Sequence, residues 1–301
     1  MVKNEGTSAF AEVAAKWLGA DARNVQMVSH GVNKNLSVPS HSGKVFVRFS
    51  PASLHPRSDL LTEAALLAAA WSQSLPCCEV IKVGNTLVGG PVQLAGLTYN
   101  WLVTREVVGT GLSPNAADAH AFGRSLAKIH TFVGAAPERS IADEPMPRDQ
   151  LAEQYGIISD VLHSLPTGHS GCGLCHGDAW MGNGIRSGAE VVLIDFEWAK
   201  RGLQVYDIAT FLWSLSPATR SNAADLFRAF LSGYSTVRLP AFDHSALRRA
   251  ILEKELESLK FLRKFIYLST PIVGATLQSS QALVKFALGE ELDRFATASL
   301  P

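Results

Sequence analysis

The chain has 301 residues, 47% of them hydrophobic and 18% charged, so it can bury a large core and does not have the composition of a disordered protein. Its 27 Lys and Arg residues balance its 27 Asp and Glu residues, which argues against a nucleic-acid-binding protein. There is no apolar stretch of the roughly 18 residues that a membrane span needs, and four cysteines are too few for a disulfide scaffold. We therefore expect a cytoplasmic protein that binds neither nucleic acid nor membranes.

The first third of the sequence predicts a mixed lobe of strands and helices. A helix is expected to begin after Thr7 or Ser8 and to end near Gly19; Glu12 and Lys16 make it amphipathic, unlike a signal peptide. Short apolar runs then predict strands, and apolar residues at helical spacing predict one further helix. Strands are expected at 25–28, 44–49, 86–94 and 98–108, and the helix at 59–74.

After Gly109 the pattern changes to long amphipathic segments. Helices are expected at 115–133, 148–163, 205–215, 219–234, 243–267 and 276–297, with short strands at 184–186 and 191–194. The sequence therefore predicts an α+β protein with a sheet lobe at 1–108 and a mainly helical lobe at 109–301. The pair Gly109 and Gly111 is expected to serve as the hinge between them.

The segment that carries chemistry contains His176, Gly177, Asp178 and Asn183, followed by Asp195 at the end of an apolar run. Asp178 is suited to accept a proton from a hydroxyl group. The Asn183 amide oxygen and the Asp195 carboxylate are the hard oxygen ligands that Mg²⁺ prefers. Their order and spacing indicate a site for a metal ion and phosphate groups.

This pattern, His-Gly-Asp-x-x-x-x-Asn followed by Ile-Asp, resembles the aminoglycoside phosphotransferase and choline kinase family, which is related to protein kinases. The run Tyr206-Asp207-Ile208-Ala209 is similar to the Tyr-Asp-Leu-Ala of that family. The resemblance covers roughly residues 20–215. It implies a two-lobed protein-kinase-like fold, ATP or GTP as phosphoryl donor, Mg²⁺ bound by Asn183 and Asp195, and Asp178 as the base that deprotonates a small-molecule hydroxyl acceptor.

The resemblance also assigns nucleotide-binding residues in the first lobe. A hairpin at 29–38 would cover the nucleotide, a strand cation would grip its phosphates, a helix carboxylate would pair with that cation, and the segment 102–109 would hold the purine. The residues implied are Gly31, Asn33, Asn35, Arg48, Glu63, Glu106 and Val107.

The sequence departs from the family pattern at two positions. Arg48 stands where the family has Lys; Arg can still bind phosphate through two parallel hydrogen bonds, and Lys44 on the same strand face is its competitor. Glu197 stands where kinases have Gly, and it either adds a carboxylate near the metal or orients a neighbour. For Asp207 we expect a structural role, either capping the helix 207–215 or bracing the catalytic loop, and for His176 a structural hydrogen-bonding role.

Other chemistries are disfavoured. The motif Cys172-x-x-Cys175-His176 matches a haem attachment pattern, but His176 already belongs to the catalytic loop, and further zinc ligands at suitable spacing are missing. The sequence contains neither a Walker-type phosphate loop nor a nucleophile elbow.

The acceptor is the open question. Its pocket is expected to be lined by Trp180, Tyr206, Glu253 and Glu257, with Trp213, Phe261 and Tyr267 nearby. An aminoglycoside-like antibiotic, with a role in antibiotic resistance, and a metabolite such as choline, homoserine or a sugar are both compatible with these residues. Protein phosphorylation is a minor option, because we find no segment resembling an activation loop. A catalytically silent nucleotide-binding or regulatory module is the alternative from another class.

Overall fold

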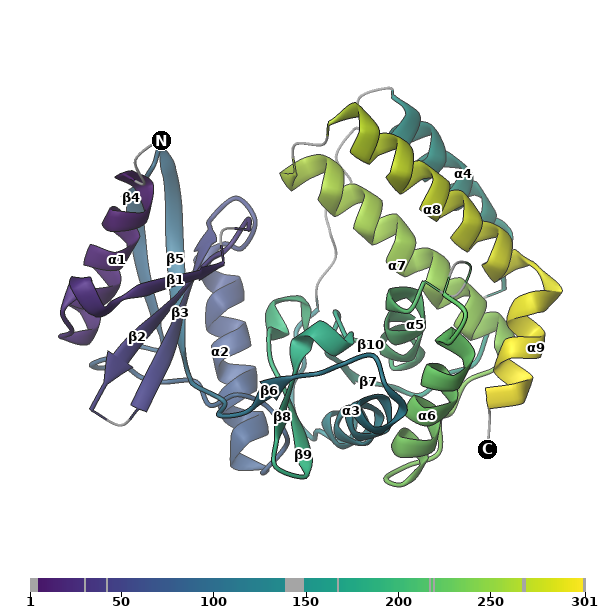
Figure 1. Cartoon of the computed structure of the whole chain (residues 1–301), viewed down its shortest axis with the longest axis horizontal. Coiled ribbons are helices and arrows are strands. Elements are labelled where there is room, and N and C mark those ends of the chain that lie inside the picture. Colours follow the sequence, from purple (N-terminus) through teal and green to yellow (C-terminus); the bar gives the residue numbers. More distant parts are fainter. Residues whose placement is uncertain are drawn as a thin grey trace. The chain divides into compact units, whose positions relative to one another are not determined.

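The computed structural model of the chain describes residues 5–29, 31–41, 43–138, 149–166, 168–216, 218, 220–266 and 269–299. The chain divides into two compact units, Met1–Val108 and Gly109–Pro301 (Figure 1). The first unit is built on an antiparallel sheet and the second is mainly helical. In the described ranges, no helix combines the length and the apolar character that crossing a membrane requires.

The sheet of the first unit has five antiparallel strands in the order β1-β2-β3-β5-β4. Its strands are β1 (Gln26–Ser29), β2 (Lys34–Ser40), β3 (Gly43–Pro51), β4 (Val88–Leu94) and β5 (Leu97–Arg105). A short turn joins β1 to β2, and Asn35 closes it by donating from Nδ2 to the Ser29 hydroxyl at 2.9 Å. The hairpin expected near residues 29–38 is therefore present.

Two helices pack against this sheet, α1 (Glu5–Leu18) and α2 (Arg57–Ser72) (Figure 1). Phe10 of α1 is buried against Phe49 and Tyr99, with ring centroids 5.2 and 5.0 Å apart. Because side chains alternate along a strand, Arg48 points to the face opposite Phe49, where it meets Glu63 of α2. The sheet thus separates an apolar core from the side that carries the ion pair.

The second unit contains seven described helices. They are α3 (Ala116–Ile129), α4 (Gln150–Ser164), α5 (Val205–Ser214), α6 (Ala223–Ser235), α7 (His244–Phe265), α8 (Thr270–Leu288) and α9 (Glu290–Ser299). Helices α3 and α6 pack with their backbones in contact. A Cβ atom on Gly123 would lie 2.0 Å from the Phe230 carbonyl oxygen, and one on Gly233 would lie 1.8 Å from that of His120. Only glycine allows this approach.

Short strands frame the segment that carries the motif. One sheet contains β6 (Thr110–Gly111), β8 (Gly184–Ser187) and β9 (Glu190–Leu193), and a second pairs β7 (Cys172–Cys175) with β10 (Lys200–Leu203). Single turns of 3-10 helix, η2 (Met181–Asn183) and η3 (Phe196–Trp198), follow the loop and β9. The chain therefore enters and leaves the motif through hydrogen-bonded strands.

One expectation from the sequence needs correction, and another stays a prediction. The helix predicted at 276–297 is two helices, α8 and α9, because the extended backbone of Gly289 (φ −84°, ψ 166°) ends the first. The hinge expected at Gly109 and Gly111 stays a prediction; both glycines also pack within the second unit. Gly111 pairs with β8, and a Cβ atom on Gly109 would lie 2.1 Å from the Arg186 carbonyl oxygen.

Candidate active site

The loop that follows β7 carries Asp178, and its conformation depends on a glycine. Gly177 has φ +84°, and a Cβ atom there would lie 2.0 Å from the Trp198 carbonyl oxygen. Any other residue would combine an unfavourable backbone conformation with a direct clash. The sequence His-Gly-Asp thus turns the chain sharply at Gly177, next to η3.

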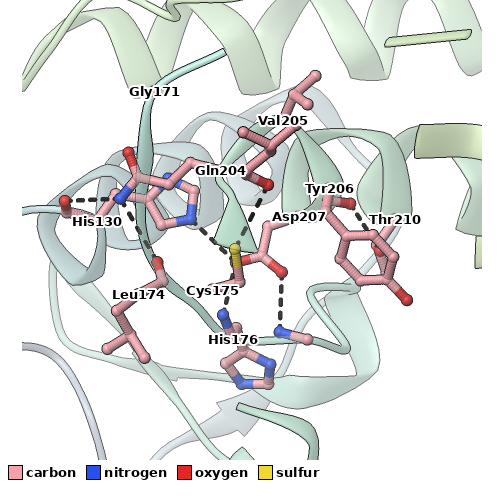
Figure 2. A network of polar contacts seen from close by, with 12 residues as sticks. His130, Gly171, Leu174, Cys175, His176, Gln204, Val205, Tyr206, Asp207 and Thr210 are labelled. Carbon is pink, nitrogen blue, oxygen red and sulfur yellow. Dashed lines mark hydrogen bonds and ion pairs between the residues drawn. The ribbon is translucent and has the colours of Figure 1, made fainter. Parts of the chain in front are cut away.

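Asp207 at the start of α5 holds this loop in place (Figure 2). Its fully buried carboxylate accepts hydrogen bonds from the backbone N–H groups of His176 at 2.6 Å and Gly177 at 2.9 Å. His130 Nε2 lies 2.9 Å from the same carboxylate, and His130 Nδ1 lies 2.8 Å from the Tyr234 hydroxyl. Burial alone would raise the pKa of Asp207, but the His130 and backbone hydrogen bonds hold it below its ordinary value. Asp207 is therefore an ionised brace for the loop.

His176 has a structural role as well. Its ring is fully buried, with Nε2 2.9 Å from the Ile194 carbonyl oxygen and Nδ1 3.3 Å from the Asp178 backbone N–H. Burial lowers its pKa, so the neutral ring donates from Nε2 and accepts at Nδ1. Since one ring nitrogen contacts Ile194 and the other contacts Asp178, His176 connects the loop to the end of β9.

Asn183 and Asp178 lie together, as their spacing predicts. Asn183 Nδ2 donates to the Asp178 carbonyl oxygen at 2.9 Å and to Asp178 Oδ2 at 3.0 Å. The amide oxygen, on the other side of the carboxamide carbon, therefore faces away from Asp178. The backbone carbonyl oxygen of Asn183 accepts a hydrogen bond from the Ile194 backbone N–H at 3.0 Å, which connects η2 to the end of β9.

Asp195 follows directly, in an unusual conformation. Its backbone is left-handed, with φ 65° and ψ 62°, which is costly for a residue other than glycine and often marks a functional position. A carboxylate and an amide oxygen from neighbouring backbone segments suit Mg²⁺, which typically takes one or two carboxylates and completes its shell with water and phosphate oxygens. The donor set of Asn183 and Asp195 thus fits this ion.

A pocket of about 550 Å³ opens beside Asp178 within the second unit. Asp178, Glu197, Glu255 and Glu257 line it, so its wall is rich in carboxylates. Four aromatic side chains also line it, namely Trp180, Trp198, Trp213 and Phe261. This combination suits a partly apolar ligand that carries positive charge.

Trp180 lies at the exposed side of this pocket. Its side chain is 43% exposed, and its ring lies so close over Gly182 that a Cβ atom there would be 2.2 Å from it. Trp213 is fixed instead by a hydrogen bond from Nε1 to Glu255 Oε2 at 2.6 Å. Glu197, whose role the sequence left open, is 7% exposed and lines the pocket together with Asp178.

Two predicted acceptor residues lie elsewhere. Tyr206 and Glu253 line a separate cavity of about 270 Å³ and not the pocket of Asp178. Tyr206 is buried and donates its hydroxyl to Glu257, while Glu253 pairs with Arg249 at 2.8 Å; burial raises the pKa of Glu253. Tyr267, also expected near the acceptor, is outside the described residues.

In the first unit, the predicted phosphate-gripping cation is paired with the predicted carboxylate. Arg48 Nη2 lies 2.5 Å from Glu63 Oε2, and the two side chains are 12% and 2% exposed. Its competitor Lys44 is 57% exposed and points instead to Glu106, with Nζ 3.4 Å from Oε1. The ion pair fixes the direction of the Arg48 guanidinium group.

The remaining predicted nucleotide-binding residues lie at two places in the same unit. Gly31 and Asn33 form the turn between β1 and β2, and Asn35 is in the first part of β2. Glu106 and Val107 follow β5, where the Glu106 backbone N–H donates to the Lys44 carbonyl oxygen at 3.1 Å. The backbone of this segment is therefore anchored to β3.

Lys254 is a pocket residue that sequence reasoning missed, as are Trp198 and Glu255. It lines the pocket from α7, with Nζ 2.7 Å from Asp178 Oδ1. Glu257 and Phe261 were already expected at the pocket. Lys254 lies about one turn before Glu257 and about two turns before Phe261 on the same face of α7, so helical spacing could have identified it. Among the pocket-lining residues that the structure describes, Lys254 is the one lysine or arginine.

Comparison with known proteins identifies the family of the chain. Residues 33–240 match the model of the phosphotransferase enzyme family. The chain therefore belongs to the phosphotransferase enzyme family. An uncharacterized protein of Deinococcus radiodurans is 24% identical over 275 residues, which cover 81% of this chain and 80% of the relative.

Solved structures of low sequence identity share the fold. An amicoumacin kinase has a TM-score of 0.74 at 14% identity and covers 94% of both chains. A microcompartment-associated aminopropanol kinase has a TM-score of 0.72 at 16% identity and covers 97% of this chain and 99% of its own. A thermostable mutant of an aminoglycoside phosphotransferase has a TM-score of 0.64 at 15% identity, covering 93% and 99%. These likenesses confirm the predicted kinase-like fold and its two lobes of different character.

Proposed function

We propose that this phosphotransferase moves the γ-phosphoryl group of ATP or GTP to a hydroxyl of a small molecule that also carries an amine. The observation that carries the proposal is the position of Asp178, in the wall of an acidic and aromatic pocket, beside Asn183. A carboxylate at the wall of a substrate-sized cavity can meet the hydroxyl of a bound acceptor.

The residues of the second unit would divide the reaction between them. Asp178 would orient the acceptor hydroxyl and take its proton as the hydroxyl oxygen attacks the γ-phosphorus. Asn183 and Asp195 are the residues that would hold Mg²⁺, which when bound neutralises charge between the β- and γ-phosphates. Asp207 and His176 would keep Asp178 at a fixed position, and such positioning supplies much of the catalysis in phosphoryl transfer.

The first unit supplies the proposed nucleotide site. Arg48, held by Glu63, would bind phosphate oxygens through its planar group of donors, which suits phosphate better than a single point charge. The turn with Gly31, Asn33 and Asn35 would lie over the phosphates, and the segment with Glu106 and Val107 would contact the purine.

The acceptor class follows from the lining of the pocket. Four carboxylates and one lysine line it, and Glu257 is further balanced by Lys200, whose Nζ lies 2.8 Å from its Oε1. The remaining negative charge and the tryptophan rings favour an ammonium group on the acceptor. Both an aminoglycoside-like antibiotic and an amino-alcohol metabolite meet this description, and the names of the aminoglycoside phosphotransferase and the aminopropanol kinase support the same range.

The test is an acceptor panel with the purified full-length protein. Aminoglycosides, choline, amino alcohols, homoserine and neutral sugars are each incubated with ATP or GTP, with and without Mg²⁺, and nucleoside diphosphate and phosphorylated acceptor are quantified. We expect Mg²⁺-dependent transfer to at least one amine-bearing acceptor and less to sugars that lack an amine. Nucleotide binding without any transfer would instead indicate a catalytically silent module.

Replacing Asp195 by Ala is expected to remove the effect of Mg²⁺ on nucleotide binding. Mutating a residue that only hydrogen-bonds to a metal ligand typically lowers metal affinity by about 10–100-fold. Loss of the carboxylate ligand itself should therefore weaken Mg²⁺-nucleotide binding by at least about tenfold. Titration of nucleotide with and without Mg²⁺ measures this. Glu190→Ala is the matched control, because Glu190 is an exposed acid at the other end of β9. An unchanged Mg²⁺ dependence in Asp195→Ala contradicts the assignment.

Replacing Trp180 by Ala is expected to raise KM for the acceptor by about 2- to 10-fold and to leave KM for the nucleotide unchanged. The ring lines the acceptor pocket, and a cation over an indole contributes about 0.5–1 kcal/mol at an exposed site, with further loss from the apolar contact area. Steady-state kinetics with each substrate varied in turn measure both constants. Trp71→Ala, which removes a tryptophan that is 48% exposed in the first unit, is the control. A change confined to the nucleotide KM rules out this role.

A further inference from the structure

Helix α7 brings a largely buried cation to the proposed base. The ammonium nitrogen of Lys254 lies 2.7 Å from Asp178 Oδ1, across 76 positions of sequence. The Lys254 side chain is 11% exposed and that of Asp178 is 27% exposed, so this ion pair is largely shielded from water. Exposed ion pairs, by contrast, typically contribute little to the stability of a protein.

The carboxylate of Asp178 is consequently held at both oxygens. Lys254 donates to Oδ1, and Asn183 Nδ2 donates to Oδ2 at 3.0 Å. Two donors on different oxygens fix the rotation of the carboxylate plane. Each carboxylate oxygen can accept more than one hydrogen bond, so a hydroxyl group can still donate to Asp178 while both contacts persist.

Lys254 is itself held by its neighbours. Its Nζ lies 5.4 Å from the centre of the Trp213 ring, a cation–π arrangement. The Trp213 ring is fixed by its hydrogen bond to Glu255, which is 6% exposed. Glu255, Trp213 and Lys254 thus form a chain of contacts that ends on Asp178, as expected for a support that fixes a catalytic group.

We propose that Lys254 is the positioning residue for Asp178 in phosphoryl transfer. This inference rests on the proposed function. In the step it supports, the acceptor hydroxyl oxygen forms a bond to the γ-phosphorus and its proton passes to the Asp178 carboxylate. The bond from the γ-phosphorus to the β–γ bridging oxygen breaks, and its electron pair leaves on the nucleoside diphosphate. Lys254 keeps its protons throughout and holds the carboxylate toward the hydroxyl.

The alternative is that the ion pair only braces α7 against the loop. A brace would affect stability, whereas a positioning residue affects the rate of the bound complex. Three variants separate these roles. Lys254→Met removes the charge and keeps the length, Lys254→Arg keeps the charge, and Lys254→Ala leaves space for an added ammonium ion. Lys264→Met is the matched control, because Lys264 is an exposed lysine ten residues further along α7.

With the best acceptor of the panel, we expect kcat of Lys254→Met to fall about 10- to 100-fold, the cost that a misplaced reacting group typically carries. KM for the nucleotide should stay within about twofold, Lys254→Arg should recover part of the rate, and added ethylammonium should raise kcat of Lys254→Ala in a saturable manner. Lys264→Met should match the wild type.

Three outcomes overturn the proposal. An unchanged kcat in Lys254→Met is the first. The second is a loss of kcat that tracks loss of folded protein, seen by circular dichroism, with recovery from neither arginine nor ethylammonium. The third is a wild-type protein that transfers phosphate to no acceptor, which also removes the proposed function and is read from the wild type alone. The first two leave the proposed function intact.

Discussion

Asp178→Asn is expected to reduce kcat for phosphoryl transfer by about 10²–10⁴-fold, the usual cost of losing a general base. The amide cannot take up the hydroxyl proton. It also cannot reproduce the present contacts, because Asp178 accepts from Lys254 at one oxygen and from Asn183 at the other, while an amide offers a single acceptor oxygen. The dissociation constant of the nucleotide should change little, because the proposed phosphate contacts are made by other residues.

The measurement is single-turnover transfer together with calorimetric titration of the nucleotide. Asp160→Asn is the matched control, since Asp160 is exposed on α4 and lines neither pocket. A kcat near that of the wild type would exclude Asp178 from the mechanism. A large rise in the nucleotide dissociation constant would place its main effect in binding.

Asp207→Ala is expected to lower the free energy of unfolding of the protein by about 3–5 kcal/mol, because each buried donor that loses its acceptor costs about 1–3 kcal/mol. The change would leave the backbone N–H groups of His176 and Gly177 and the ring of His130 without their acceptor in the core. Urea unfolding followed by fluorescence measures the loss. Asp225→Ala is the control, because Asp225 is 74% exposed in its pair with Arg228 and should contribute about 0–1 kcal/mol.

The stability difference between the wild type and Asp207→Ala should depend on pH. The pKa of Asp207 is lower in the folded protein than in the unfolded chain, where it is about 3.9, so its contribution to stability is complete above that value. It is lost as the pH falls through the folded-state pKa. The stability difference between wild type and Asp207→Ala should therefore be constant near neutral pH and should shrink below about pH 4. A difference that grows on acidification contradicts this account.

The loop was predictable from the sequence because its groups are close along the chain. Asp178 and Asn183 are five positions apart, and one turn of 3-10 helix between them brings their side chains into hydrogen-bond contact. The Arg48–Glu63 pair was predictable from the family pattern, since a strand and the helix after it are packed together in that fold. Periodicity found most helices for the same local reason.

Contacts made by the C-terminal helices were not predictable in this way. Glu253 and Lys254 are adjacent on α7, yet about 100° of helix rotation between neighbours directs one into the small cavity and the other to Asp178. The prediction from the sequence names Glu253, although helical spacing with Glu257 and Phe261 favours Lys254. The end of α8 at Gly289 was equally hidden, since the apolar spacing continues into α9.

The close contact of α3 and α6 at Gly123 and Gly233 supports the site from outside the residues that line it. His130, directly after α3, and Tyr234 of α6 are hydrogen-bonded to each other, and His130 also contacts Asp207. A methyl group on Gly123 or Gly233 would force the two helices apart and disturb the hydrogen bonds that link Tyr234, His130 and Asp207. In a random mutagenesis library, inactivating substitutions should therefore occur at these two glycines. The positions that do not tolerate substitution should thus include residues that do not contact the acceptor.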